Sequence, residues 1–368
     1  MVVLPRPRLV GQQSRQAARP CLDKPRPGRA CKRGEHRKGA SQCRETLRPR
    51  ADGDRAVLRC AGTAKPCAFF SFAGFWRIRQ AMTDFLKMHG LGNDFIIFDW
   101  RDGGPATVSE AAARALADRR TGIGCDQILV IRPSDRADIR MDILNHDGSP
   151  SGACGNGTRC VADLVMESGM GPGTDRPLTI ETDGADLRAW RAGADISVDM
   201  GPVATGWADV PLAHAADTLA VPLGIDGLGD AVCHSLGNPH AVVFVDDAEA
   251  VDLPRLGPLA ETSPLFPDRV NLSVVSRMDD GSFRMRVWER GVGITMACGS
   301  GACAVGVAVA RRGLAGDANR IVMDGGAVTI DWDRETTHVT MTGQVAYVCE
   351  GSLSAGLAGL LEAGDVRP

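Results

Sequence analysis

Two cysteines of this 368-residue chain stand in nearly identical settings, Cys154 in SGACGNGTRC (151–160) and Cys298 in TMACGSGACA (295–304). Each cysteine precedes a glycine-rich segment that predicts the first turn of a helix. The free N–H groups and the positive dipole of a helix N-terminus attract an anion and lower the pKa of a thiol placed there. A thiolate is a usable base near neutral pH, whereas a thiol that keeps its proton is an acid. Two such groups on opposite faces of one carbon could invert its configuration.

An internal repeat places the two cysteines in equivalent positions. The segment HGLGNDFIIFD (89–99) resembles HSLGNPHAVVFVDD (234–247), and IRMDILNHDG (139–148) resembles FRMRVWERGV (283–292). The offset of 144 or 145 residues also aligns the two cysteine motifs, and it aligns Gln127 with Asn271. Glycine-rich turns that look alike by chance explain one such match but not four in the same order. We therefore expect a duplicated domain, with one cysteine on either side of a cleft between the halves.

The elements that must position the cysteines are short strands and one helix in each half. Runs such as FIIFDW, ILVIRP and IRMDILN predict strands, since they are bounded by Gly, Asp and Asn. Helices are predicted at 155–169, ending at Gly169, and at 299–313, ending at Gly313. The second helix is almost wholly apolar and should be buried. We expect an α+β protein of two pseudo-symmetric domains, each a mainly antiparallel sheet curled around a central helix, with the active site in the cleft between them.

The charge of the chain divides it at about residue 81. Residues 1–81 contain 19 Lys and Arg against 5 Asp and Glu, whereas residues 82–368 contain 23 against 40. Because the first segment shows no apolar period, we expect it to be disordered. We favour an upstream stretch wrongly included in the reading frame, with a targeting peptide or a nucleic-acid-binding tail as alternatives. We expect one half at 82–199, with a strand near 343–357 as a candidate to complete it, the other half at 200–342, and a tail at 358–368.

The remaining composition argues against a metal, a cofactor and a membrane span. Seven cysteines follow Met82, and an odd number without a secretory signal favours reduced thiols in the cytosol. Their spacing matches no common zinc site. Lys87 is the only lysine after Met82, so a pyridoxal phosphate enzyme would depend on it. No apolar run reaches the length of about 18 residues that a transmembrane helix needs. We expect an inversion that needs no cofactor and no metal.

Six segments resemble, in order, those of the diaminopimelate epimerase family. They are KMHGLGNDF (87–95), GIGCDQ (122–127), NHDGSPSGACGNGTRC (145–160), LGNPH (236–240), RVN (269–271) and WERGVGITMACGSGACA (288–304). The resemblance runs from about Phe85 to Gly351. It implies a cytoplasmic, homodimeric isomerase that interconverts LL- and meso-diaminopimelate without a cofactor, on the route to lysine and peptidoglycan. We expect diaminopimelate as the small-molecule partner, and neither nucleic acid nor a membrane.

The resemblance also implies roles for individual residues. Cys154 and Cys298 correspond to the family's two catalytic cysteines, and His240 and Glu289 resemble the residues that tune those thiols. Arg290 would grip the distal carboxylate in a bidentate fork, aided by neutral asparagine hydrogen bonds. The proximal carboxylate would lie between the two helix N-termini. The implied substrate-binding residues are Asn93, Gln127, Asn145, Gly155, Asn156, Asn238, Asn271, Glu289, Arg290, Gly299 and Ser300.

Two positions depart from the family pattern. Ile294 stands where many members have a glutamate before the second cysteine, and Cys125 stands where an apolar aromatic residue is frequent. We expect neither side chain to contact the substrate. Two alternatives stay open: a two-cysteine racemase of the proline or hydroxyproline type, and a thiol redox or binding protein on the same scaffold. The arginine and its asparagines favour a substrate with a second, distal charged end.

Overall fold

The computed structural model describes residues 83–152, 154–169, 171 and 176–362. The expected basic segment at 1–81 and the last residues of the expected tail, 363–368, lie outside these ranges. The first half follows the order β1 (Asp84–Gly90), β2 (Asn93–Asp99), α1 (Glu110–Ala117), β3 (Gln127–Arg132), β4 (Ile139–Asn145), α2 (Gly155–Glu167), β5 (Leu178–Glu181), β6 (Asp186–Ala192) and β7 (Asp195–Pro202).

The second half repeats this order with one short extra strand, β12. It runs through β8 (Ala231–Ser235), β9 (Pro239–Phe244), α3 (Leu253–Glu261), β10 (Asn271–Arg277), β11 (Phe283–Glu289), β12 (Gly293–Ile294), α4 (Gly299–Arg311), β13 (Ala318–Met323), β14 (Gly326–Trp332) and β15 (His338–Gly343). The chain then continues through β16 (Ala346–Ser352) and α5 (Ala355–Glu362), so residues 358–362 of the expected tail belong to a helix.

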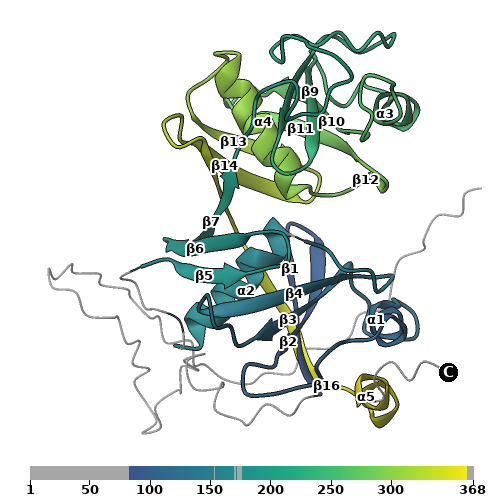
Figure 1. Ribbon diagram of the computed structural model, residues 1–368, viewed down its shortest axis with the longest axis vertical. Helices are drawn as coiled ribbons and strands as arrows, with labels where there is room; N and C mark the ends of the chain where they lie inside the picture. The colour runs from purple at the N-terminus through teal and green to yellow at the C-terminus, as the bar shows by residue number, and fades with distance from the viewer. Residues whose placement is uncertain (1–82, 153, 170, 172–175, 363–368) are drawn as a thin grey trace, which may run out of the picture. The chain divides into compact units, whose positions relative to one another are not determined.

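Strand pairing is the same in both halves. In the first half β1–β2, β3–β4, β5–β6 and β6–β7 are antiparallel, whereas β2–β3 and β4–β5 are parallel. In the second half β8–β9, β10–β11, β13–β14 and β14–β15 are antiparallel, whereas β9–β10 and β11–β13 are parallel. The predicted two-domain α+β fold with mainly antiparallel, curled sheets is confirmed, and both halves carry two parallel junctions as well (Figure 1).

One central helix fills the core of each half. Helix α2 packs inside the strands of the first half, and α4 packs inside those of the second (Figure 1). Every residue of α4 from Gly301 to Ala310 is buried, as its apolar sequence predicts. The helices end two residues before the predicted positions, with Ser168 and Arg312 as C-caps. Gly169 and Gly313 follow with φ of 71° and 66°, the left-handed conformation that glycine adopts most readily after a helix.

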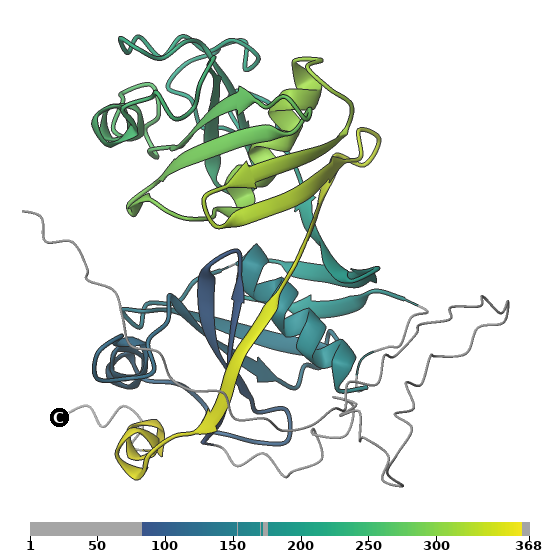
Figure 2. The same ribbon diagram turned by 180° about the vertical axis from the view of Figure 1, so that it is seen from behind.

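Two strand pairings connect the halves. β7 of the first half pairs antiparallel with β15 of the second, so the strands form one continuous path from β16 to β8. β16 pairs antiparallel with β1, which returns the end of the chain to the first half (Figure 2). Along the ranges that the structure describes, no helix combines the length and apolar character that crossing a membrane requires.

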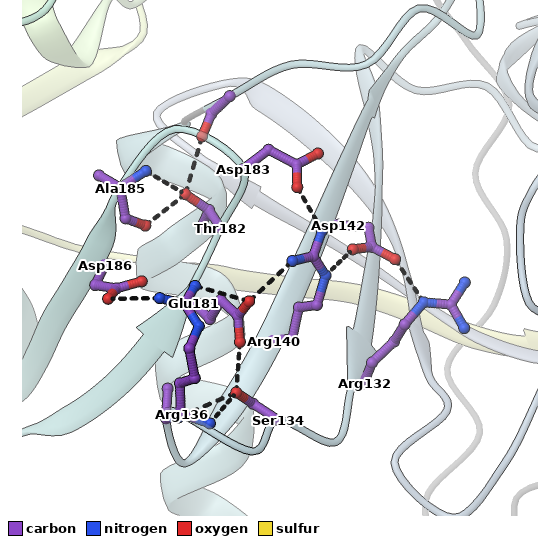
Figure 3. Close-up of polar contacts among 12 residues, drawn as sticks. Arg132, Ser134, Arg136, Arg140, Asp142, Glu181, Thr182, Asp183, Ala185 and Asp186 are labelled. Carbon is purple, nitrogen blue, oxygen red and sulfur yellow. Dashed lines mark hydrogen bonds and ion pairs between the residues drawn. The ribbon is translucent and has the colours of Figure 1, made fainter.

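Charged side chains reinforce the short parallel junction between β4 and β5 (Figure 3). The junction has only two residue pairs, Ile139 with Ile180 and Arg140 with Glu181. Glu181 Oε1 accepts hydrogen bonds from Arg136 Nη2 at 2.9 Å and Arg140 Nη1 at 3.0 Å, and Glu181 Oε2 accepts one from Ser134 Oγ at 2.5 Å. These bonds hold the pKa of Glu181 at about 2.

Candidate active site

Both cysteines are the N-cap residues of the central helices, as the sequence predicts. Cys154 caps α2 and Cys298 caps α4, each with extended backbone angles. Gly157 N–H donates to Cys154 Sγ at 3.4 Å. Each thiol lies close against the first helical turn: a Cβ at Gly157 would be 3.4 Å from Cys154 Sγ, and one at Gly301 would be 3.2 Å from Cys298 Sγ. The tightest contacts of a Cβ at these two equivalent positions would be with core side chains, Leu129 at 3.0 Å for Gly157 and Met285 at 2.7 Å for Gly301.

The N-termini of α2 and α4 lie close together. A Cβ at Gly155 would be 2.5 Å from the Met341 Cε atom, and one at Gly299 would be 3.3 Å from the same atom. The Cβ position of Gly299 is also 3.9 Å from Asn156 Oδ1. Met341, which comes from β15, therefore contacts both helix N-termini. These contacts bring the two predicted thiols and their backbone N–H groups into one region.

An amide network surrounds Cys154. The Cys154 thiol donates to Asn93 Oδ1 at 3.7 Å, and Asn156 Nδ2 donates to the same oxygen at 3.3 Å. The other end of the Asn93 amide donates to Asp126 Oδ2 at 2.9 Å. Asp126 accepts in turn from Arg119 Nη2 at 2.8 Å. Because the carboxylate of Asp126 accepts hydrogen bonds and the Nδ2 group of Asn93 donates them, this contact leaves the oxygen end of the Asn93 amide facing the thiol.

The segment before Cys154 is anchored by the turn between β5 and β6. Thr182 Oγ1 donates to Gly152 O at 2.9 Å, and Gly184 N–H donates to the same oxygen at 3.0 Å. The same turn carries Asp183, which forms an ion pair with Arg140 of the charged network. The ion pairs of Arg140 at the β4–β5 junction therefore help to hold the turn that anchors Gly152, two residues before Cys154.

Two further predicted binding residues meet across β3 and β4. Gln127 opens β3, Asn145 closes β4, and the two residues are direct cross-strand partners. Gln127 Nε2 donates to Asn145 Oδ1 at 2.9 Å, and Asn145 Nδ2 donates to Ser149 Oγ at 3.0 Å. Both side-chain amides therefore have fixed orientations.

The second half builds a corresponding set of contacts around Cys298. The thiol lies 3.7 Å from Ser300 Oγ, which accepts a hydrogen bond from Asn238 Nδ2 at 3.4 Å. The charge of Glu289 acts directly on the Cys298 thiol, and Thr295 Oγ1 donates to Glu289 Oε1. The structure thus brings three of the predicted site residues, Ser300, Asn238 and Glu289, together at this thiol.

The predicted Asn271 and Arg290 are held together next to this set. Asn271 Nδ2 donates to Pro239 O at 2.9 Å, and Arg290 N–H donates to Asn271 Oδ1 at 3.0 Å. Among the described residues, the Arg290 guanidinium donates one hydrogen bond, from Nη1 to Asp268 O at 2.9 Å. A guanidinium has five donors, so most of those of Arg290 remain available for a ligand.

His240 is fully buried, and its Nε2 atom lies 3.0 Å from Asn238 Oδ1. Burial, reinforced by the positive charge of Arg290, lowers the pKa of His240 to about 3. The ring is therefore neutral at physiological pH. Among the contacts of the described residues, the His240 ring contacts Asn238 and neither cysteine. Any effect of His240 on the pKa of a thiol, as predicted, therefore has to pass through the Asn238 amide.

The predicted lowering of the thiol pKa values is wrong. Burial raises the pKa of Cys154 to about 11, although the Gly157 N–H group and the charge of Arg159 oppose this rise. Burial raises the pKa of Cys298 well above its ordinary value, and the negative charge of Glu289 raises it further. The loss of solvation in the packed core exceeds the effect of the helix N-terminus.

Sequence reasoning missed Asp126, Thr295, Met341 and Arg159. Asp126 and Thr295 lie inside quoted motifs, where the adjacent Gln127 and Ile294 drew the attention. The exposed fraction of Ile294 is 42%, and the side chain offers no hydrogen bond. Thr295, its neighbour, is the residue that contacts Glu289. A surface hollow lined by residues 223–226, Arg255, Leu259 and residues 262–264 contains none of the predicted site residues.

A family model described as "Diaminopimelate epimerase" matches residues 85–205 and 232–348. The diaminopimelate epimerase of Rhodospirillum centenum is 55% identical over 277 residues, which cover 74% of this chain and 93% of that protein. The diaminopimelate epimerase of Acidiphilium cryptum is 48% identical over 279 residues, which cover 75% of this chain and 98% of that protein.

Solved structures share the fold at low sequence identity. A probable proline racemase from Agrobacterium radiobacter K84 gives a TM-score of 0.55 at 18% identity and covers 74% of this chain and 93% of its own. A PhzF-family phenazine biosynthesis protein from Bacillus anthracis gives a TM-score of 0.51 at 17% identity, and the match covers 74% of this chain and 99% of that protein. These two similarities concern the fold alone.

Proposed function

Because this chain belongs to the diaminopimelate epimerase family, we propose that it interconverts LL- and meso-diaminopimelate by two proton transfers, one from the substrate to one cysteine and one from the other cysteine to the substrate. The observation that carries the proposal is the pair of thiols, Cys154 and Cys298, at the N-termini of two neighbouring helices. The shared contact of both helices with Met341 supports their acting on one ligand.

In the proposed reaction, the deprotonated Cys154 takes the proton from the α-carbon of one stereoisomer. The electron pair left on that carbon spreads onto the adjacent carboxylate, and the Cys298 thiol delivers its own proton to the opposite face. The carbon is inverted, Cys154 ends as a thiol and Cys298 as a thiolate, so the reverse reaction starts from Cys298. Backbone N–H groups at the starts of α2 and α4 stabilise the negative charge on the carboxylate.

The same proposal accounts for the polar side chains around the thiols. Arg290, with its unused donors, would bind the distal carboxylate. Amide side chains would orient the remaining polar groups, and their fixed partners in the free protein reduce the ordering that binding requires. The proposed substrate-binding residues are Asn93, Gln127, Asn145, Gly155, Asn156, Asn238, Asn271, Glu289, Arg290, Gly299 and Ser300.

The test follows the α-proton of LL-diaminopimelate by proton NMR in heavy water with reduced protein. We expect loss of the signal together with appearance of the meso isomer. Cys154→Ala and Cys298→Ala should each abolish inversion, whereas Cys349→Ala, which changes an exposed free cysteine on β16, should retain it. Inversion that persists in both active-site variants would refute the mechanism. A reduced, folded protein that exchanges the α-proton of proline instead would favour the proline-type racemase.

We also infer a homodimer in a reducing, cytoplasmic compartment. β16 is an end strand of the sheet path, and it exposes 47% of Tyr347 and 56% of Val348. An exposed apolar end strand is a ready surface for a second copy. The seven cysteines of the described part of the chain are free thiols, which supports a reducing environment. The mass of the reduced protein in solution tests the dimer, and a monomer at micromolar concentration would contradict it.

A further inference from the structure

Arg159 is a fully buried cation without a matching anion. Its side chain projects from α2, and its exposed fraction is 0%. Nη2 donates to Asn156 Oδ1 at 2.9 Å, Nη1 lies 3.3 Å from Met341 Sδ, and Nε has no hydrogen-bond partner. Within the described ranges, no carboxylate lies at ion-pair distance from this guanidinium. Burying an unmatched charge is costly, so the surroundings of Arg159 favour a negative charge nearby.

The groups that can supply this charge come from several elements. Arg159 reaches the contacts of Cys154 through Asn156, because Asn156 Nδ2 donates at 3.3 Å to the same Asn93 oxygen that accepts from the Cys154 thiol at 3.7 Å. The positive charge of Arg159 opposes the rise in the pKa of Cys154, of Cys160 in α2 and of Cys303 in α4. Cys160 and Cys303 have no exposure, and burial raises the pKa of both thiols, that of Cys303 to about 12.

Cys154 differs from these two buried thiols. It is half-buried rather than fully buried, and Gly157 N–H donates to its sulfur. The other charged group that acts on Cys154 is Glu289 of β11, whose effect is weaker than that of Arg159. Cys154 is therefore the thiol best placed to carry the negative charge that Arg159 favours.

The internal repeat shows that this cation belongs to one half only. With the offset of 144, Arg159 of α2 corresponds to Cys303 of α4, and Asn145 at the end of β4 corresponds to Glu289 at the end of β11. The first half thus combines a buried cation with a neutral amide, whereas the second combines a neutral thiol with a carboxylate. The backbone is duplicated, but at these two pairs of positions the positive charge of Arg159 and the negative charge of Glu289 each occur in one half only.

We propose that Arg159 is a positioning residue: its buried guanidinium stabilises the thiolate of Cys154, and not that of Cys298, so that the free protein begins turnover with Cys154 as the base. This inference rests on the proposed function for its consequence in turnover. The electrostatic claim itself concerns the free protein, so it can be measured without substrate.

The experiment measures the rate at which iodoacetamide alkylates Cys154 and Cys298 in the reduced full chain between pH 6 and 10. Mass spectrometry of the peptides separates the two sites. Arg159→Met removes the charge at similar length, and Arg159→Lys keeps a charge without the planar fork. The matched control is Arg311→Met, which removes an arginine of α4 that donates to Cys233 O at 3.0 Å and Thr218 Oγ1 at 2.8 Å.

We expect Arg159→Met to slow the alkylation of Cys154 at pH 7 by about tenfold or more, as an increase of one unit in its apparent pKa requires. In the Arg159→Lys and Arg311→Met variants, the alkylation rate of Cys154 should stay within about threefold of the rate in the wild-type chain, because both variants keep a positive charge at position 159. A folded Arg159→Met variant with the original pH profile would overturn the inference. If Arg159→Met does not fold, a tenfold loss in folded Arg159→Lys would overturn it instead. Failure of the protein to epimerise diaminopimelate would leave these rates unaffected.

Discussion

The substitution Thr295→Val tests how the environment of Glu289 controls the second cysteine. Burial raises the pKa of Glu289 above its ordinary value of 4.5, and the hydrogen bond from Thr295 opposes that rise. A hydrogen bond to a charged group contributes about 1.5–3 kcal/mol, and one pKa unit corresponds to about 1.4 kcal/mol. Valine has nearly the shape of threonine without its hydroxyl. We therefore expect the substitution to raise the pKa of Glu289 further, because the charged form loses a hydrogen bond that contributes about 1.5–3 kcal/mol.

The direct assay is a titration of the Glu289 carboxyl carbon by NMR in uniformly ¹³C-labelled, reduced protein. Glu289→Gln assigns the signal, and Thr295→Ser, which keeps the hydroxyl, serves as the control. Because Glu289 raises the pKa of Cys298, a larger neutral fraction of Glu289 should also make Cys298 easier to deprotonate. A carboxyl titration that is the same in Thr295→Val and in the unmodified protein would refute the assigned role of Thr295.

Two further predictions concern stability and oxidation. Hydrogen bonds from Ser134 and then Arg136 hold the pKa of Glu181 at about 2, below its ordinary 4.5, so the stabilisation that they provide is complete above about pH 4.5 and is lost as the pH falls towards 2. Glu181→Gln should therefore lower the midpoint of urea unfolding at pH 6 more than at pH 3. The control Glu335→Gln, at an exposed position, should change the midpoint at neither pH. Equal losses at both pH values in Glu181→Gln would contradict the assigned role of Glu181. Activity should require a reductant, because a disulfide between Cys154 and Cys298 removes both base and acid, and full activity in a preparation shown to carry that disulfide would exclude the proposed mechanism.

Much of the architecture was predictable because it is encoded in a repeat. The offset of 144 aligns not only the cysteines but also the ends of β4 and β11 and the starts of α2 and α4. Glycine and apolar patterns predicted both central helices to within two residues at their ends. The two parallel junctions in each half were not predicted, because strand pairing depends on contacts between residues far apart in the sequence.

The electrostatics of the site were less predictable, because they depend on burial. A helix N-terminus alone predicts an acidic thiol, yet desolvation reverses the direction for both Cys154 and Cys298. Arg159 looks like a surface residue in sequence, since arginine on a helix usually faces solvent. Every residue of α2 from Gly155 to Val165 is buried, so this arginine has no route to solvent. Only the three-dimensional packing reveals its unmatched charge.

The difference between the halves has a chemical reason. Two cysteines in identical surroundings that share one proton would hold it on either sulfur with equal probability, and their titration would belong to the pair rather than to one residue. The proton can be on Cys298, with Cys154 as the thiolate, or on Cys154, with Cys298 as the thiolate. For a given stereoisomer, only one of these two arrangements presents a base to the face that carries the α-proton. In the mechanism that we propose, the positive charge of Arg159 favours a thiolate at Cys154 and the negative charge of Glu289 disfavours one at Cys298, so one arrangement is preferred before the substrate binds. In that mechanism the duplicated fold supplies the geometry of inversion, and the substitutions that distinguish its two halves decide where the proton starts.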